Sequence, residues 1–164
     1  MRDTYINREL SLLEFNKRVL AQAADPSIPL LERVRFLCIS CTNLDEFFEI
    51  RVAGLKQRME IGAPAQGPEN IPADVVFDEL QVGVADMITQ QYKILNEQLL
   101  PQLGEAGVRF LSSAEWNDEQ KAWIDDYFSE QVLPVLTPLT FDPARPFPRV
   151  LNKSLNFIVR LDGK

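Results

Sequence analysis

One short polar stretch combines residue types that could recognise a ligand: Thr42-Asn43-Leu44-Asp45. The amide of Asn43 carries a hydrogen-bond donor and an acceptor side by side, which is the pattern that one edge of adenine also presents. The apolar periodicity breaks near Ser40, so we predict that a new helix starts at Thr42, where unpaired N–H groups would also attract a phosphate. A structural role is the alternative, because asparagine is among the preferred helix caps.

The charge of the chain limits the ligands that it can bind. The net charge is −7, and residues 63–164 carry the whole excess, with 8 Lys/Arg against 15 Asp/Glu. An acidic chain is a poor general binder of nucleic acid, because such binding needs a surplus of Lys and Arg. Any contact with phosphate must therefore come from a local group of basic residues. The candidates are Arg33, Arg35, Arg51, Lys56 and Arg58.

The sequence contains no histidine, which removes the commonest general base, phosphoryl carrier and metal ligand. We therefore assign no catalytic residue and no metal ligand to the chain. Cys38 and Cys41 form a C-x-x-C pattern, but a zinc site needs about four ligands and a redox motif needs a strand-to-helix context. We interpret both cysteines as small residues on a buried helix face. Asp45, Glu46 and Glu49 are interpreted as solvated charges near a helix start.

Apolar residues recur at three- and four-residue steps through much of the first hundred residues, which predicts helices. The first helix should cover 11–24, with Ser11 and Glu14 forming a capping box. A second should begin at Pro29 and end near Ser40, and a third should run from Thr42 to Gly62. After a loop at 62–72, a long helix is predicted at 74–103, with Asp74 as its cap and Pro101 near its end. Helices of these lengths pack as an antiparallel bundle.

After Gly107 the character of the sequence changes. Residues 108–111 are short and β-prone, a helix is predicted from Asn117 to Phe128, and prolines exclude regular structure around 134–148. Residues 155–161 are predicted as a strand, and because this strand has no partner we expect a truncated second domain. The predicted fold class is therefore mainly α: an antiparallel helical bundle at 1–105, followed by a truncated α+β segment at 106–164.

No apolar run is long enough for a transmembrane helix. The polar N-terminal residues lack the apolar core of a secretory signal. We therefore expect a cytoplasmic protein, and peripheral attachment to a membrane is left open.

Two groups of segments resemble the polyphosphate kinase family. The first covers 5–20, 29–37 and 42–52, and contains Asn43-Leu44-Asp45-Glu46-Phe47. The second covers 136–139, 146–148 and 152–156, and contains Leu136-Thr137-Pro138-Leu139. Their order and spacing also match, over nearly the whole chain. The chain is therefore identified as similar to the N-terminal domain of that family, followed by the start of its middle, or head, domain.

This resemblance implies an enzyme that reversibly transfers the terminal phosphate of ATP to inorganic polyphosphate, through a phosphorylated histidine and with Mg²⁺. In the family these groups belong to the C-terminal part, so we expect the present chain alone to be inactive. The implied partners are ATP or ADP, polyphosphate and further copies of the full-length enzyme. The asparagine of the family motif contacts the base of ATP, which implies this role for Asn43. The alternative is a non-catalytic helical module for dimerisation or interdomain packing.

Overall fold

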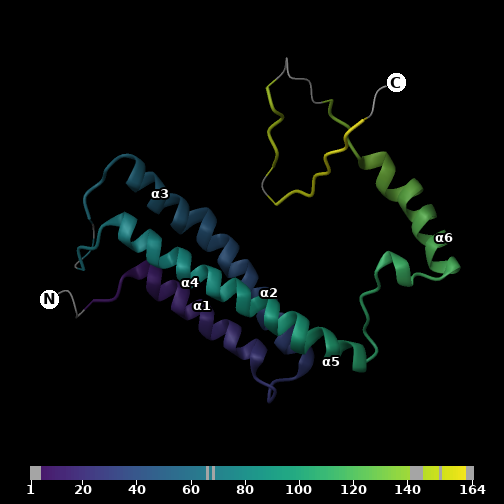
Figure 1. Ribbon diagram of the computed structural model, residues 1–164, viewed down its shortest axis with the longest axis horizontal. Coiled ribbons are helices and arrows are strands. Elements are labelled where there is room, and N and C mark those ends of the chain that lie inside the picture. Colours follow the sequence, from purple (N-terminus) through teal and green to yellow (C-terminus); the bar gives the residue numbers. More distant parts are fainter. Residues whose placement is uncertain (1–4, 66, 68, 141–145, 152, 162–164) are drawn as a thin grey trace. The chain divides into compact units, whose positions relative to one another are not determined.

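The computed structural model describes residues 5–65, 67, 69–140, 146–151 and 153–161. It divides the chain into two units, Met1–Phe110 and Leu111–Lys164, which we describe separately. The first unit contains three long helical segments (Figure 1). The first is α1 (Arg8–Ala24); the second joins α2 (Leu30–Glu46), a π-helical part (Phe47–Val52) and α3 (Ala53–Glu60); the third joins α4 (Ala73–Ile94), a π-helical part (Leu95–Leu99) and α5 (Leu100–Glu105).

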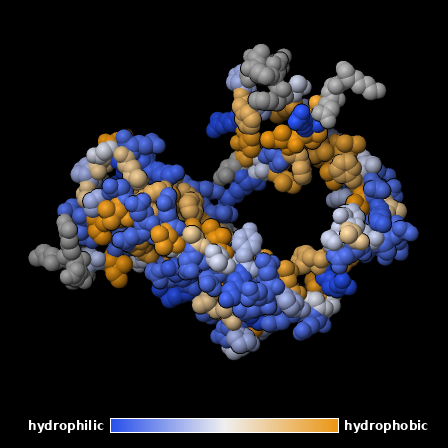
Figure 2. Space-filling model, viewed as in Figure 1, coloured by the Kyte–Doolittle hydropathy of each residue, from blue (hydrophilic) through white to orange (hydrophobic). Residues whose placement is uncertain are grey.

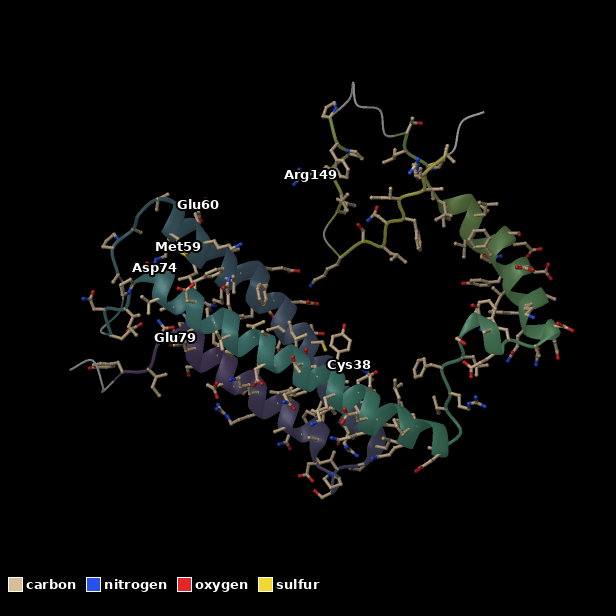
Figure 3. The ribbon with its side chains drawn as sticks, viewed as in Figure 1. Cys38, Met59, Glu60, Asp74, Glu79 and Arg149 are labelled. Atoms are coloured by element: carbon tan, nitrogen blue, oxygen red, sulfur yellow. The ribbon has the colours of Figure 1, made fainter. Side chains whose placement is uncertain are left out.

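The three segments form an antiparallel bundle, as the sequence predicts. Helix α1 packs against α2 and α4, while α3 packs against α4 and the π-helical part Leu95–Leu99 packs against α2. The labelled residues Met59 and Glu60 at the end of α3 and Asp74 and Glu79 near the start of α4 lie at the same end of the bundle (Figure 3). The second segment therefore runs opposite to the third. The mainly α fold class is confirmed.

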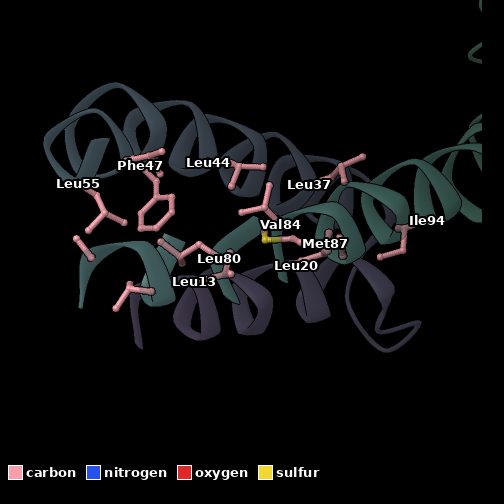
Figure 4. Close-up of a cluster of buried hydrophobic side chains, with 14 of the residues drawn as sticks. Leu13, Leu20, Leu37, Leu44, Phe47, Leu55, Leu80, Val84, Met87 and Ile94 are labelled. Atoms are coloured by element: carbon pink, nitrogen blue, oxygen red, sulfur yellow. The ribbon is translucent and has the colours of Figure 1, made fainter. Parts of the chain in front are cut away.

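The core of the bundle is built from apolar side chains of all three segments (Figure 4). They include Leu13 and Leu20 of α1, Leu37 and Leu44 of α2, and Leu80, Val84 and Met87 of α4. Gly83 lets α1 and α4 approach each other closely, because a Cβ at this position would lie 2.7 Å from the Leu13 Cδ2 atom.

Helix α1 begins earlier than expected. Its cap is Asn7, whose Oδ1 atom accepts from the backbone N–H groups of Glu9 at 3.0 Å and Leu10 at 3.2 Å. The Nδ2 atom of Asn7 donates to the buried carboxylate of Glu69 at 3.0 Å. This long-range contact fixes Asn7 at the helix start, so the predicted capping box at Ser11 is wrong. Helix α4 also begins differently from the prediction, because Pro72 and not Asp74 is in the cap position.

The predicted break between Ser40 and Thr42 is wrong, because the helix continues from α2 through the π-helical part into α3. Ser40 is fully buried, and its hydroxyl oxygen accepts from the Nε2 atom of Gln91 at 2.8 Å. The hydroxyl of Ser40, which suggests a break, is thus satisfied by a neighbouring helix. The expected end of this segment is confirmed: Gly62 has a φ of 60°, and the Ala63 N–H donates to the Arg58 carbonyl at 3.0 Å, which is a Schellman motif.

Pro101 does not end the third helical segment of the first unit, which continues through α5 to Glu105. Proline lacks an N–H group and its ring clashes with the carbonyl four residues earlier in an α-helix. The π-helical part Leu95–Leu99 ends two residues before Pro101 and includes the residue four positions before it, and this wider turn makes room for the ring. The helix ends at Glu105, and Gly107, with a φ of 88°, follows its cap residue Ala106.

The second unit contains a 3₁₀ turn (Ser113–Glu115), α6 (Asp118–Tyr127), a π-helical part (Phe128–Val132) and a 3₁₀ turn (Leu133–Val135). The helix expected from Asn117 is confirmed, and Asn117 and Gln120 form its capping box. The strand expected at 155–161 is not formed, the β-prone residues 108–111 are irregular, and no strand occurs among the described residues. None of the described residues of this unit is buried, and apolar side chains gather on its irregular segments (Figure 2).

Across the described ranges, no helix is both long and apolar enough to cross a membrane.

Candidate functional site

A pocket of about 250 Å³ opens in the first unit between α1 and the segment formed by α2 and Phe47–Val52. Its walls are mostly apolar, with a few polar groups among them. Small-molecule sites have this character, because apolar surface supplies affinity and a few polar groups fix the orientation. The lining residues are Leu12, Leu13, Phe15, Asn16, Asn43, Leu44, Glu46, Phe47, Ile50 and Arg51.

Asn43 lines this pocket from the middle of a continuous helix. The prediction that it lies at a helix start is wrong, and with it the interpretation of Asn43 as a cap and the expected attraction of phosphate by free N–H groups. The side chain is half-buried, and its Nδ2 atom donates to the Oδ1 atom of Asn16 at 3.2 Å. Across the described part of the chain, the Oδ1 atom of Asn43 accepts no hydrogen bond.

Behind Asn43 lies a buried polar cluster that connects three helices. Asn16 of α1 donates from Nδ2 to the backbone carbonyl of Ser40 at 2.9 Å, and the same atom lies 3.8 Å from the Met87 sulfur. Gln91 of α4 donates to the Ser40 hydroxyl. Buried polar groups are costly unless they are paired, so this cluster specifies how the helices are aligned. Sequence reasoning missed it, because its members are far apart in the chain.

Of the five basic residues that the sequence offers for phosphate contact, only Arg51 lines the pocket. Its guanidinium makes no ion pair or hydrogen bond with the residues that the structure describes. An unpaired arginine can bind an anion through several N–H groups at once. The other four are engaged elsewhere: Arg33 is buried, Arg35 lies 3.8 Å from Glu32, Lys56 lies over the Phe77 ring and Arg58 donates to the Pro64 carbonyl.

The π-helical part Phe47–Val52 shapes one side of the pocket, and sequence reasoning did not predict it. Phe47 and Val52 are both buried although they are five residues apart, a spacing that would separate them by about 140° on an α-helix. This spacing is the signal that could have revealed the wider turn. Phe47 belongs to the core, whereas Phe48 is 43% exposed. π-Helical turns are frequent at functional sites.

The acidic residues near Asn43 are exposed, but they do not lie at a helix start. Glu46 lines the pocket, while Asp45 lies outside it. Among the described residues, no group of three or more His, Cys, Asp or Glu side chains could hold a metal ion.

Cys38 and Cys41 are both exposed, so the interpretation of a buried helix face is wrong. The inward face of α2 is taken by Leu37, Ser40 and Leu44, which leaves the cysteines on the outside. Partial burial raises the pKa of the Cys41 thiol, with smaller contributions from Cys38 and Asp45.

A raised thiol pKa lowers the fraction of thiolate at any given pH, and the thiolate is the reactive form. We therefore expect iodoacetamide to alkylate Cys41 more slowly at about pH 8 than it alkylates a cysteine in an unstructured peptide. The rate is measured by mass spectrometry on a Cys38→Ser variant, in which only Cys41 can react. A rate equal to that of the peptide would contradict the expectation.

The fold defines a helical-bundle domain that carries a small, mostly apolar pocket, followed in the chain by a second unit. The family model for the polyphosphate kinase N-terminal domain matches residues 5–111, and that for the polyphosphate kinase middle domain matches residues 119–164. The chain therefore belongs to the polyphosphate kinase family.

Individual relatives agree with this assignment. The chain is 51% identical over 159 residues to a polyphosphate kinase of Burkholderia cenocepacia (strain HI2424), covering 97% of this chain and 23% of the relative. It is 50% identical to a polyphosphate kinase of Paraburkholderia phytofirmans, with the same coverage. The crystal structure of polyphosphate kinase from Porphyromonas gingivalis matches with a TM-score of 0.73 and 31% identity, covering 89% of this chain and 21% of that one. The chain thus spans less than a quarter of the length of these relatives.

Proposed function

We propose that this chain is the N-terminal part of an enzyme that reversibly transfers the terminal phosphate of ATP to inorganic polyphosphate, and that the pocket beside Asn43 binds the adenine base. Family membership supports the reaction. The observation that carries the proposed site is the position of Asn43, whose half-buried amide lines an apolar pocket and keeps its carbonyl oxygen free of other described residues.

The size of the pocket supports a base rather than a whole nucleotide. Its volume of about 250 Å³ is below the range of roughly 300–1,000 Å³ that is usual for complete ligand sites. Apolar side chains such as Leu12, Phe15 and Ile50 could enclose a flat ring, while Asn43 offers a donor and an acceptor to its edge. Arg51 is then the nearest candidate for a contact with the ribose or the phosphates.

The chemistry itself is proposed to lie elsewhere in the full-length enzyme. The chain has no histidine, and its described residues do not offer a set of metal ligands. We assign the phosphorylated histidine and the Mg²⁺ site, both implied by the family, to the C-terminal part. The helical domain at 1–105 would bind the base, and 106–164 would begin the middle domain. Positioning is a large part of catalysis in phosphoryl transfer, so a base-binding domain contributes without touching the reacting phosphate.

An interaction role is the second candidate, and the surface of the second unit favours it. Trp123 is 64% exposed, Phe157 is 79% exposed and Ile158 is 92% exposed. Large exposed apolar surfaces usually mark contacts with other protein. We propose that this unit packs against further parts of the enzyme or a second subunit of a homo-oligomer. The two roles belong to different units and can coexist.

Photolabelling of the full-length enzyme tests the base site directly. A photoreactive ATP with an azide on the adenine ring should label the tryptic peptides 9–17 and 36–51, which together carry all ten residues that line the pocket. Excess ATP should suppress this labelling, and inorganic triphosphate, which has no base, should suppress it much less. Specific labelling that is confined to peptides outside the pocket would refute the proposed site.

A further inference from the structure

In the hydrogen bonds behind Asn43, the chemistry of the groups fixes which atom donates and which atom accepts. The backbone carbonyl of Ser40 can only accept a hydrogen bond, so the atom of Asn16 that lies 2.9 Å from it must be the amide nitrogen. The Oδ1 atom of Asn16 therefore faces the other way, and it accepts from the Nδ2 atom of Asn43 at 3.2 Å. Asn16 is only 4% exposed, so water cannot easily replace either partner.

The orientation of the Asn16 amide in turn fixes the orientation of the Asn43 amide. If the amide of Asn43 were turned over, its Oδ1 atom would face the Oδ1 atom of the buried Asn16, and two acceptors would meet in a partly buried place. The Oδ1 atom of Asn43 is consequently held on the side away from Asn16. Asn43 then presents one acceptor and its remaining N–H donor to a ligand in the pocket.

We infer that Asn16 is a positioning residue that orients the Asn43 amide, and that this orientation makes the site select purines with an exocyclic amino group over purines with an oxygen at the same position. This inference rests on the proposed function. An amino group donates to Oδ1 of Asn43 while the neighbouring ring nitrogen accepts from Nδ2. An oxo group in the same place would set two acceptors against each other.

The test compares nucleotides in the full-length enzyme. The wild-type enzyme should use ATP about tenfold better than inosine triphosphate, measured as kcat/KM, because one hydrogen bond is lost and a repulsion is gained. Purine riboside triphosphate, which has neither group, should fall between them. If the wild-type enzyme uses ATP and inosine triphosphate equally well, the inference is overturned without recourse to any variant.

Two substitutions of Asn16 separate orientation from stability. Asn16→Ala frees the Asn43 amide to turn, so the preference for ATP over inosine triphosphate should fall by roughly fivefold to tenfold. Asn16→Asp keeps an oxygen that accepts from Asn43, so it should retain most of the preference despite a lower Tm. Gln91→Ala is the matched control: it disrupts the same buried cluster at Ser40 but removes no hydrogen bond of either asparagine, and it should lower the Tm while leaving the preference unchanged.

The failure of this inference is distinguishable from the failure of the base site. If Asn43→Ala abolishes the preference but Asn16→Ala leaves it at the wild-type value, Asn43 contacts the base without help from Asn16, and the inference is overturned. If Asn43→Ala changes neither the KM for ATP nor the preference, the proposed base site itself is refuted, and the inference falls with it.

Discussion

Replacing Asn43 by alanine should lower the kcat/KM of the full-length enzyme for ATP by about fivefold to thirtyfold. The variant loses up to two hydrogen bonds to the base, each worth roughly 1 kcal/mol. The base lies away from the reacting phosphate, so the loss should appear mainly as a higher KM with a nearly unchanged kcat. Steady-state kinetics with varied ATP and saturating polyphosphate measure both constants.

The same substitution has a smaller structural cost. Without Asn43, the Oδ1 atom of the buried Asn16 loses the donor that now lies 3.2 Å away. We expect the free energy of unfolding to fall by about 1 kcal/mol. Thr42→Ala is a suitable control, because Thr42 is an exposed neighbour that does not line the pocket. A loss of stability with an unchanged KM for ATP would show that Asn43 is a structural residue only.

The second large effect concerns Arg33, which is 3% exposed at one end of the bundle. Its Nε atom donates to the Ala23 carbonyl at 2.8 Å, and its two terminal nitrogens donate to Gln102 at 2.8 Å and Gln98 at 2.9 Å. Arg33→Ala leaves three acceptors without their donor and opens a cavity. We expect it to lower the free energy of unfolding by roughly 3 kcal/mol or more.

Urea unfolding of the chain, followed by far-UV circular dichroism, measures this loss. Arg35→Ala is the matched control, because Arg35 is exposed and lies 3.8 Å from Glu32, and such surface pairs contribute about 0–1 kcal/mol. Arg33→Met should cost less than Arg33→Ala, since both remove the buried charge but the methionine side chain fills part of the space that alanine leaves empty. If Arg33→Ala and Arg35→Ala have the same effect, the three hydrogen bonds of Arg33 do not stabilise the bundle.

The sequence predicts the helical bundle well wherever the signal is local. The apolar periodicity of 74–99 and the glycine at position 62 are enough to place a long helix and the end of another. The prediction fails where a distant residue decides the structure. Ser40 interrupts an apolar pattern, and only its hydrogen bond to Gln91, fifty-one residues away, explains why the helix continues there. Asn7 displaces the expected cap because Glu69 holds it.

In the candidate site, too, local features could be predicted from the sequence and features that depend on distant residues could not. Asn43 could be selected from the residues that resemble the family motif, but its setting could not be predicted, because the pocket needs side chains of α1 beside those of Phe47–Val52. Arg33 and Arg51 look alike in the sequence. Packing alone makes one a buried anchor and leaves the other beside the pocket.

The wide turn at Phe47–Val52 means that the number of residues in this stretch could change without unfolding the helix. A π-helical turn arises when one extra residue is accommodated in a continuous helix, so a deletion of one residue here could be absorbed by a return to α-helical geometry. The hydrophobic contacts on either side, at Leu44 and Leu55, would then survive. Ile50 and Arg51 would rotate by up to about 100° relative to the pocket. Such a shortened protein should remain folded and change the shape of its pocket, which makes the shape of the pocket and thermal stability independently adjustable in this domain.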